Sequence, residues 1–155
     1  LHKKWLTHIM QNTQIKDMML EVRREYEQRQ GYEIDDGCRL SHYVQDRVAL
    51  ANAFRPYSTF ARIGEVFGKD HATIIHYTKE HEPMMNTYPS YLVKYQLALD
   101  LTHKIAQRMA LAPQIKIGRD RNLHNELRTI KRTIKNLKLF QQKIEITLGI
   151  NEEDS

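Results

Sequence analysis

One segment, residues 63–81, constrains the fold of this chain more than any other. It reads IGEVFGKDHATIIHYTKEH, and its first apolar run ends at Gly68, a residue type that commonly terminates a helix. Lys69, Asp70, His71 and Thr73 then place polar side chains around the first turn of a second helix. The segment predicts two helices joined by a tight turn, the second beginning with groups that can reach base edges in a DNA major groove.

The remaining periodicities are helical as well, so we predict an all-α fold. Apolar residues at spacings of three and four mark helices over residues 3–12, 15–30, 41–54, 59–67 and 91–111. Gly31 should end the second of these, and Pro83 should end the helix that starts at Asp70 near residue 82. In the 91–111 helix the inward side chains should be Leu92, Tyr95, Leu99 and Ile105.

In the C-terminal segment apolar residues repeat every seven positions. Two series repeat every seven residues and are offset by four: Leu123, Ile130, Leu137 and Ile144, and Leu127, Ile134, Gln141 and Leu148. This pattern is typical of a coiled-coil seam, in which a polar residue such as Gln141 can fix register. We expect residues 120–148 to form a homo-oligomer through this seam, or to fold back on the 91–111 helix.

The C-terminal segment is also basic. Residues 113–149 contain nine Lys or Arg residues and three acidic residues, whereas the whole chain of 155 residues carries a net charge of +5. These cations are either the solvated face of a packed helix or an arm that neutralises DNA phosphates.

Composition argues against several other classes of protein. The single cysteine, Cys38, cannot form an internal disulfide, and no apolar run approaches the roughly 20 residues that span a bilayer. We therefore expect a cytoplasmic protein with no membrane partner. The chain begins with Leu, so we also expect a short segment before it.

Catalytic and metal-binding patterns are missing from the sequence. His71, His76 and His81 are spaced by five, which does not place them on one helix face as metal ligands. There is no phosphate-binding glycine loop, and Cys38 lacks a nucleophile motif. We expect no enzyme activity, no metal and no cofactor.

The motifs of residues 63–81 resemble the C-terminal DNA-binding domain of the bacterial chromosomal replication initiator DnaA, which has a helix-turn-helix of Trp-repressor type. The likeness extends upstream to Arg39 and Arg47, which stand eight residues apart as in that family's basic loop, and it covers about residues 15–82. The chain differs in three places: one residue fewer between Phe67 and Asp70, Ala72 where that family has Ser or Thr, and a stretch from Arg47 to Ile63 that is two residues shorter.

The resemblance implies sequence-specific binding of double-stranded DNA in replication initiation or its regulation, without the ATPase module. The expected base contacts are Asp70, His71, Thr73 and Arg39, with Arg39 in the minor groove. The expected backbone contacts are Arg47, Arg55, Arg62, Lys69 and Lys79. In a competing interpretation, Asp70 only caps its helix while His71 and Thr73 are solvated.

Two functional alternatives stay open, namely a transcriptional regulator with the same fold and a coiled-coil assembly protein with a vestigial DNA domain. The expected organisation has six parts: an N-terminal arm (1–14), the DNA-binding domain (15–83), a helical extension (84–112), a joint (113–119), a basic coiled-coil-like helix (120–149) and a tail (150–155).

Overall fold

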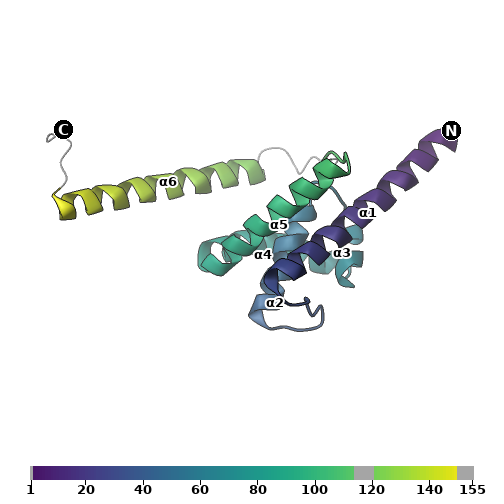
Figure 1. Cartoon of the computed structure of the whole chain (residues 1–155), viewed down its shortest axis with the longest axis horizontal. Coiled ribbons are helices and arrows are strands. Elements are labelled where there is room, and N and C mark those ends of the chain that lie inside the picture. Colours follow the sequence, from purple (N-terminus) through teal and green to yellow (C-terminus); the bar gives the residue numbers. More distant parts are fainter. Residues whose placement is uncertain (1, 114–120, 150–155) are drawn as a thin grey trace. The chain divides into compact units, whose positions relative to one another are not determined.

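The computed structural model describes residues 2–113 and 121–149, and all of the regular structure in these ranges is helical (Figure 1). This confirms an all-α fold for the part described. The helices are α1 (His2–Gln30), α2 (Ser41–Phe54), α3 (Phe60–Phe67), α4 (His71–Thr87), α5 (Pro89–Arg108) and α6 (Arg121–Leu148). Helices α1–α5 belong to one compact unit and α6 to another. None of the described helices combines the length and the apolar character needed to cross a membrane.

The core of the first unit is built from one stripe on each of its helices. On α1 the fully buried side chains are Met18, Met19, Val22 and Tyr26, which recur at the spacing of one helix face. The other helices cover this stripe with Val48, Leu50, Phe54, Ile63, Phe67, Ile74, Tyr91, Leu101 and Ile105. Helices α2, α4 and α5 pack on one another, and α3 packs on α1 and α4.

The N-terminal arm and the helix that follows it are one continuous helix. The sequence predicted separate stretches over residues 3–12 and 15–30, but α1 runs unbroken from His2 to Gln30. Gly31 follows with a φ of +81°, which confirms the expected stop. Burial begins only at Ile15, so the first turns of α1 leave a group of large apolar side chains exposed: Trp5, Leu6, Ile9 and Met10.

Helix α4 does not end at Pro83, contrary to the sequence-based expectation. It continues through this proline to Thr87, and the Tyr88 N–H donates to the Met84 carbonyl oxygen at 2.9 Å. Proline costs one backbone hydrogen bond inside a helix. Met84 and Met85 lie beyond it and pack against the core, and this burial offsets that cost.

Helix α5 belongs to the core of the first unit and is not an extension added to it. Its inward side chains include Tyr91, Ala98, Leu101 and Ile105, all of which are buried. Ile105 was predicted correctly, whereas Leu92 is 50% exposed. The core is therefore not bounded at residue 83, since α5 covers α1 and α2 from outside the predicted DNA-binding segment.

A buried carboxylate ties three of these helices together. Asp46 of α2 is fully buried and accepts hydrogen bonds from Tyr26 of α1 at 2.5 Å and from Tyr32 at 2.7 Å. Lys94 of α5 completes the network, with its Nζ 2.9 Å from Asp46 Oδ1. Burial, followed by the hydrogen bond to Asp46, raises the pKa of the Tyr26 and Tyr32 hydroxyls, so both remain donors.

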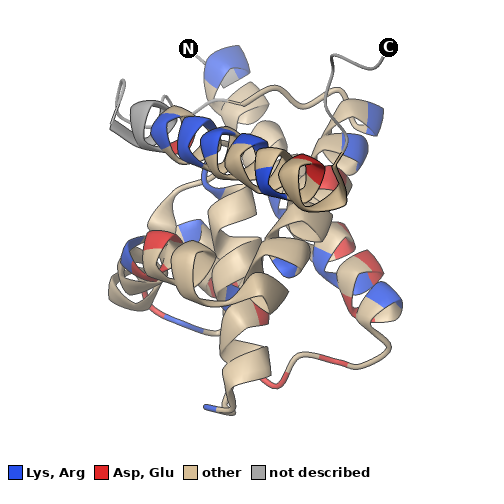
Figure 2. Ribbon diagram, turned by 90° about the vertical axis from the view of Figure 1, so that its left-hand side faces the viewer, with Lys and Arg blue, Asp and Glu red and all other residues tan. Residues whose placement is uncertain are grey.

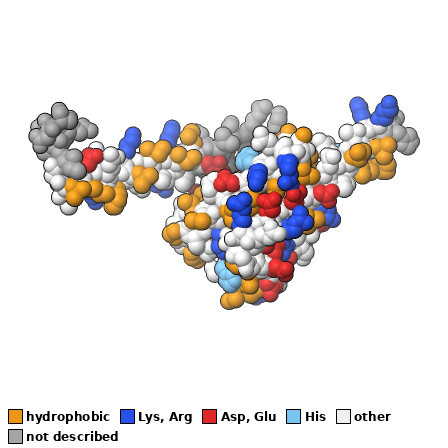
Figure 3. Space-filling model, in the orientation of Figure 1, with side chains coloured by type: hydrophobic (Ala, Val, Ile, Leu, Met, Phe, Trp, Pro, Cys, Tyr) orange, Lys and Arg blue, Asp and Glu red, His pale blue; other side chains and the backbone are white. Residues whose placement is uncertain are grey.

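Helix α6 forms the second unit and presents two kinds of surface. Figure 2 marks lysines and arginines at intervals along it, and Figure 3 marks its exposed hydrophobic side chains. Side chains are described from residue 126 onward, so Leu123 lies outside the described side chains. The expected joint (113–119) and tail (150–155) fall almost wholly outside the described residues. Of the basic C-terminal positions, residues 116 and 119 lie outside them too, and the side chain of residue 121 is not among those described.

Candidate nucleic-acid interface

The α3–turn–α4 unit has a specific hydrogen-bonded group at each junction. The sequence offers Ser58 or Thr59 as the cap of α3, and in the structure Thr59 caps it, with its side chain accepting from the Arg62 N–H. Gly68 ends α3 with a left-handed φ of +62°, and the Lys69 N–H donates to the Gly64 carbonyl oxygen at 2.9 Å. Asp70 then caps α4. The turn between the helices therefore consists of residues 68–70.

Gly64 permits the close approach of the turn to α3. It is buried within α3, and a Cβ added there would overlap the carbonyl oxygen of Lys69, a backbone atom of the turn. No side-chain rotation can relieve this overlap. Its neighbours Ile63 and Phe67 are fully buried, so α3 cannot move outward without exposing them.

Gly64→Ala should therefore lower the free energy of unfolding by about 2–3 kcal/mol, the cost typical of overpacking a close contact. Chemical denaturation followed by circular dichroism measures it. Gly37→Ala is the matched control, because a Cβ at residue 37 meets only the Asp35 side chain at 3.5 Å. Equal stability of the two variants would show that the turn is looser than described.

One face of α4 is free and the other is buried. Ile74 and Tyr77 point into the core, whereas His71, Ala72, His76 and Lys79 are exposed. The structure therefore brings two of the predicted DNA contacts, His71 and Lys79, onto the outer surface of one helix. The sequence interpretation did not select His76, although it lies four residues after Ala72 and three before Lys79, which places it on the same face.

Asp70 acts as the N-cap of α4. Its Oδ1 accepts from the Thr73 backbone N–H at 2.9 Å and from the Thr73 hydroxyl at 2.8 Å. The backbone hydrogen bond and then the hydroxyl lower the pKa of this carboxyl group from its ordinary value. The capping interpretation is thus confirmed for Asp70. The cap also occupies the Thr73 hydroxyl, which donates to the same carboxylate oxygen. The second carboxylate oxygen of Asp70 remains able to accept a hydrogen bond from the amino group of a base.

Arg47 is buried, which corrects its predicted role as a surface contact to the DNA backbone. Its side chain is only 4% exposed, and its guanidinium donates to the carbonyl oxygens of Asp35 at 2.6 Å and Cys38 at 2.9 Å. A third hydrogen bond, 3.1 Å long, reaches the Tyr77 hydroxyl of α4. Arg47 therefore links the loop before α2 to the inner side of α4.

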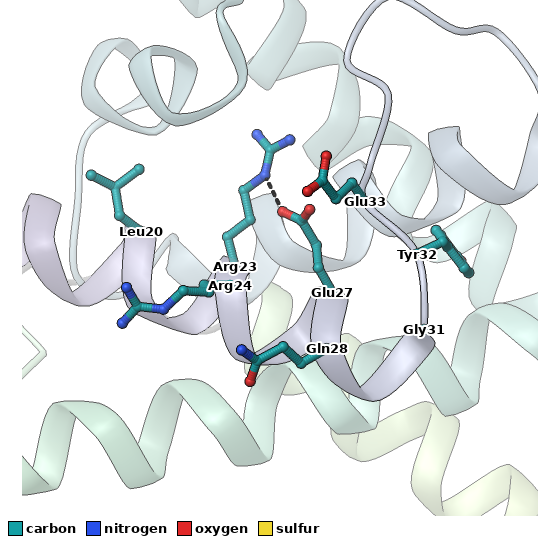
Figure 4. A pocket seen from close by; sticks show the side chains of 8 residues that line it. All are labelled: Leu20, Arg23, Arg24, Glu27, Gln28, Gly31, Tyr32 and Glu33. Atoms are coloured by element: carbon teal, nitrogen blue, oxygen red, sulfur yellow. Dashed lines mark hydrogen bonds and ion pairs between the residues drawn. The ribbon is translucent and has the colours of Figure 1, made fainter.

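The same loop is fixed from α1 by a second arginine. Arg23 donates to Glu27 at 2.7 Å, to Asp36 Oδ2 at 2.9 Å and to the Ile34 carbonyl at 3.1 Å, and it also reaches the Val66 carbonyl of α3 at 2.8 Å. Figure 4 shows Arg23 and Glu27 side by side in a groove of about 410 Å³. Because both groups are engaged in holding the loop, this groove is not a strong candidate for a ligand site.

Arg39 lies at the end of the loop that Arg23 and Arg47 hold. Its side chain is exposed and makes no hydrogen bond or ion pair with the described residues. It directly follows Cys38, whose carbonyl Arg47 binds. The eight-residue spacing of the two arginines thus has a physical meaning here: Arg47 is a buried support and Arg39 is the free cation that the supported loop presents.

The other predicted backbone contacts are only partly free. Arg55 donates to the Ser58 carbonyl at 2.9 Å and stacks over the Phe60 ring, while Arg62 donates to Asn12 at 2.6 Å. Lys69 lies half-buried in the turn, with no hydrogen bond or ion pair to its side chain in the part of the chain described. Of the five predicted backbone contacts, Lys79 is therefore the one with an exposed side chain.

The three histidines of α4 are not equivalent. His81 lies inward, with Nδ1 2.6 Å from the Tyr91 hydroxyl, and burial lowers its pKa to about 4. His71 and His76 are exposed. Within the residues described, no three His, Cys, Asp or Glu side chains come close enough to hold a metal ion.

No family model matches the chain, and the comparisons with curated proteins and with solved structures gave no match either. The resemblance to the DnaA domain therefore depends on the motif residues themselves.

Proposed function

We propose that this protein binds double-stranded DNA, with α3 and α4 acting as a helix-turn-helix and α4 entering the major groove. The observation that carries the proposal is the exposed polar face of α4. It starts at a capped N-terminus and contains His71, His76 and Lys79, while the opposite face is packed in the core. A rigidly supported helix with a free polar face is the element that reads base edges.

The supported loop supplies a second contact. Arg39 is an exposed cation on a segment whose carbonyls are bound by Arg23 and Arg47, and Arg47 also binds α4 through Tyr77. A guanidinium next to a helix in the major groove can enter the neighbouring minor groove, where the potential is most negative. Lys69 and Lys79 would contact phosphates and fix the position of α4 on the duplex.

The sequence likeness to the DnaA domain further suggests the process, namely recognition of an origin-like site in replication initiation or its control. Selection of bound sequences from a random duplex pool tests the DNA proposal. An enriched motif bound more tightly than random duplex, with affinity that falls as salt rises, is the expected result. A pool that stays random after repeated selection would contradict sequence-specific binding.

His71→Ala should weaken binding to the selected site by about 1–3 kcal/mol and change binding to random duplex much less. The reason is that His71 is exposed at the first turn of α4, where side chains reach base edges. His103→Ala is the matched control, since His103 is an exposed histidine on α5. Fluorescence anisotropy on both duplexes measures the difference, and equal losses on the two would show that His71 does not read bases.

A further inference from the structure

Helix α6 has an apolar stripe that nothing else described in its own unit covers. Positions that recur at alternating steps of three and four hold Gln141 and six aliphatic side chains, and these six are 42–66% exposed: Leu127, Ile130, Ile134, Leu137, Ile144 and Leu148. In heptad notation, residues 127, 134, 141 and 148 are a positions, and 130, 137 and 144 are d positions. A stripe of this period fits another helix that has the same period.

Helix α5, the alternative partner within the chain, has no such stripe to offer. Its inward residues Tyr91, Ala98, Leu101 and Ile105 are already buried in the core of the first unit. The large hydrophobic side chains that α5 leaves exposed are Leu92 and Val93, which are adjacent and form no seam. Folding back would require α5 to leave a core that it completes.

We propose that α6 pairs with α6 of a second copy of this chain as a two-stranded coiled coil, parallel and in register. This inference is independent of the proposed DNA binding, because no residue of the α3–turn–α4 unit enters it. Two separate observations specify the parallel orientation.

The first observation is the single polar residue of the seam. Gln141 occupies an a position and donates one hydrogen bond to Glu145 of its own helix at 3.0 Å. A side-chain amide has a second N–H and a carbonyl oxygen to satisfy. In a parallel, in-register pair, Gln141 faces Gln141 of the second copy and the two amides can bond to each other. In an antiparallel pair every a position faces a d position, so Gln141 would face Leu or Ile and lack a partner.

The second observation is the distribution of charge beside the seam. The e positions hold Lys131, Lys138 and Glu145, and the g positions hold Glu126, Thr133, Phe140 and Thr147. In a parallel pair each g position faces the e position five residues later on the other helix. Glu126 then faces Lys131 of the second copy, and no pair of like charges arises in residues 126–148.

Antiparallel alignments place like charges opposite each other, because in them e positions face e positions. Lys131 would face Lys138 or Lys131 of the second copy, or Lys138 would face its own counterpart, depending on the alignment. The remaining cations, Arg128, Arg132, Lys135 and Lys143, lie at b, c and f positions and stay on the outer faces of the pair. The helix can therefore be strongly basic and still self-associate.

The pairing has a consequence for the rest of the molecule. In each copy the helix-turn-helix precedes α6 in the sequence, so a parallel pair attaches both DNA-binding units to the same end of the seam. The Leu139 and Ile146 side chains, at f positions, lie outside a two-stranded seam. Stoichiometry is therefore part of the test.

Disulfide trapping in the full-length chain tests orientation. In a Cys38→Ser background, Leu127→Cys and Ile144→Cys are prepared separately and equilibrated in a glutathione redox buffer. Each variant should form a disulfide-linked dimer, because each position faces itself in a parallel pair. In every antiparallel alignment, residue 127 lies far from residue 127 of the second copy. Failure of both variants to cross-link would overturn the parallel pair, and sedimentation of the wild-type chain as a monomer, trimer or tetramer would overturn the two-stranded seam.

Charge exchange provides a second measurement on the native seam. Glu126→Lys should raise the dissociation constant of the dimer about tenfold, since two attractive pairs become repulsive, and adding Lys131→Glu should restore it. Arg132→Glu, which makes the same charge change at an f position, is the matched control for Lys131→Glu. A double variant that associates no better than Glu126→Lys alone would show that these two side chains do not face each other.

Discussion

Replacing Arg47 with alanine should lower the free energy of unfolding by about 3 kcal/mol and also weaken DNA binding. The substitution removes a buried guanidinium and leaves the Asp35 and Cys38 carbonyls and the Tyr77 hydroxyl without their donor. Arg47→Lys should recover only part of the loss, because an ammonium group cannot reproduce the planar fork of donors. Urea denaturation and anisotropy on the selected duplex measure the two effects.

Arg39→Ala is the control that distinguishes a residue supporting the loop from a residue contacting DNA. Arg39 is exposed and makes no hydrogen bond or ion pair with the described residues, so its removal should leave the unfolding midpoint unchanged and weaken DNA binding. An Arg47→Ala protein with wild-type stability and poor DNA binding would contradict the supporting role. It would return Arg47 to the direct contact that the family resemblance implies.

The second large effect is expected at Asp46. Asp46→Ala should lower the free energy of unfolding by about 4 kcal/mol, because removing one member of a buried ion pair leaves the other charge uncompensated. Lys94 loses its partner at 2.9 Å, and the Tyr26 and Tyr32 hydroxyls lose their acceptor. Since the three side chains come from α1, α5 and the segment between α1 and α2, the loss loosens their packing on α2.

An exposed ion pair of the same unit is the control for Asp46. Lys16 and Glu65 lie 3.3 Å apart, and both side chains are at least half exposed. Glu65→Ala should therefore change stability by less than about 1 kcal/mol. Lys94→Ala combined with Asp46→Ala completes a double-mutant cycle, and strictly additive losses would show that the two charges do not interact.

Buried Arg47 and partly buried Arg23 also bear on how tightly DNA could be bound. A free loop of about ten residues would lose conformational entropy on ordering against a duplex, and that loss subtracts from affinity. Here Arg23 and Arg47 order the segment between α1 and α2 in advance through bonds to the Ile34, Asp35 and Cys38 carbonyls. Arg39 would then lose its side-chain freedom on binding, whereas the backbone of the loop is already ordered.

Several elements followed from the sequence because neighbouring residues decide them. The bounds of α2, the cap of α3 at Thr59, its stop at Gly68 and the cap of α4 at Asp70 depend on side chains within four positions. Hydrophobic spacing likewise predicted helices over residues 15–30, 41–54 and 59–67, and their apolar side chains Met18, Val22, Phe54 and Ile63 are buried. Helix caps and hydrophobic periodicity depend on residues that are close together in the sequence, so they can be predicted without knowledge of the fold.

Tertiary contacts decided the rest. Nothing near Arg47 in the sequence marks it as buried, since its three acceptors lie 9, 12 and 30 positions away. Pro83 was predicted to end α4, and the core packing of Met84 and Met85 outweighs that local preference. The heptads of α6 predicted an apolar stripe and left two partners open, a second copy or the 91–111 helix, and the burial of the inward face of α5 in the first unit argues against the second. The sequence by itself determined where most of the helices and their apolar faces lie. Whether a side chain contacts a partner molecule or supports the fold was decided by the tertiary structure, because that role depends on which distant groups come within bonding distance.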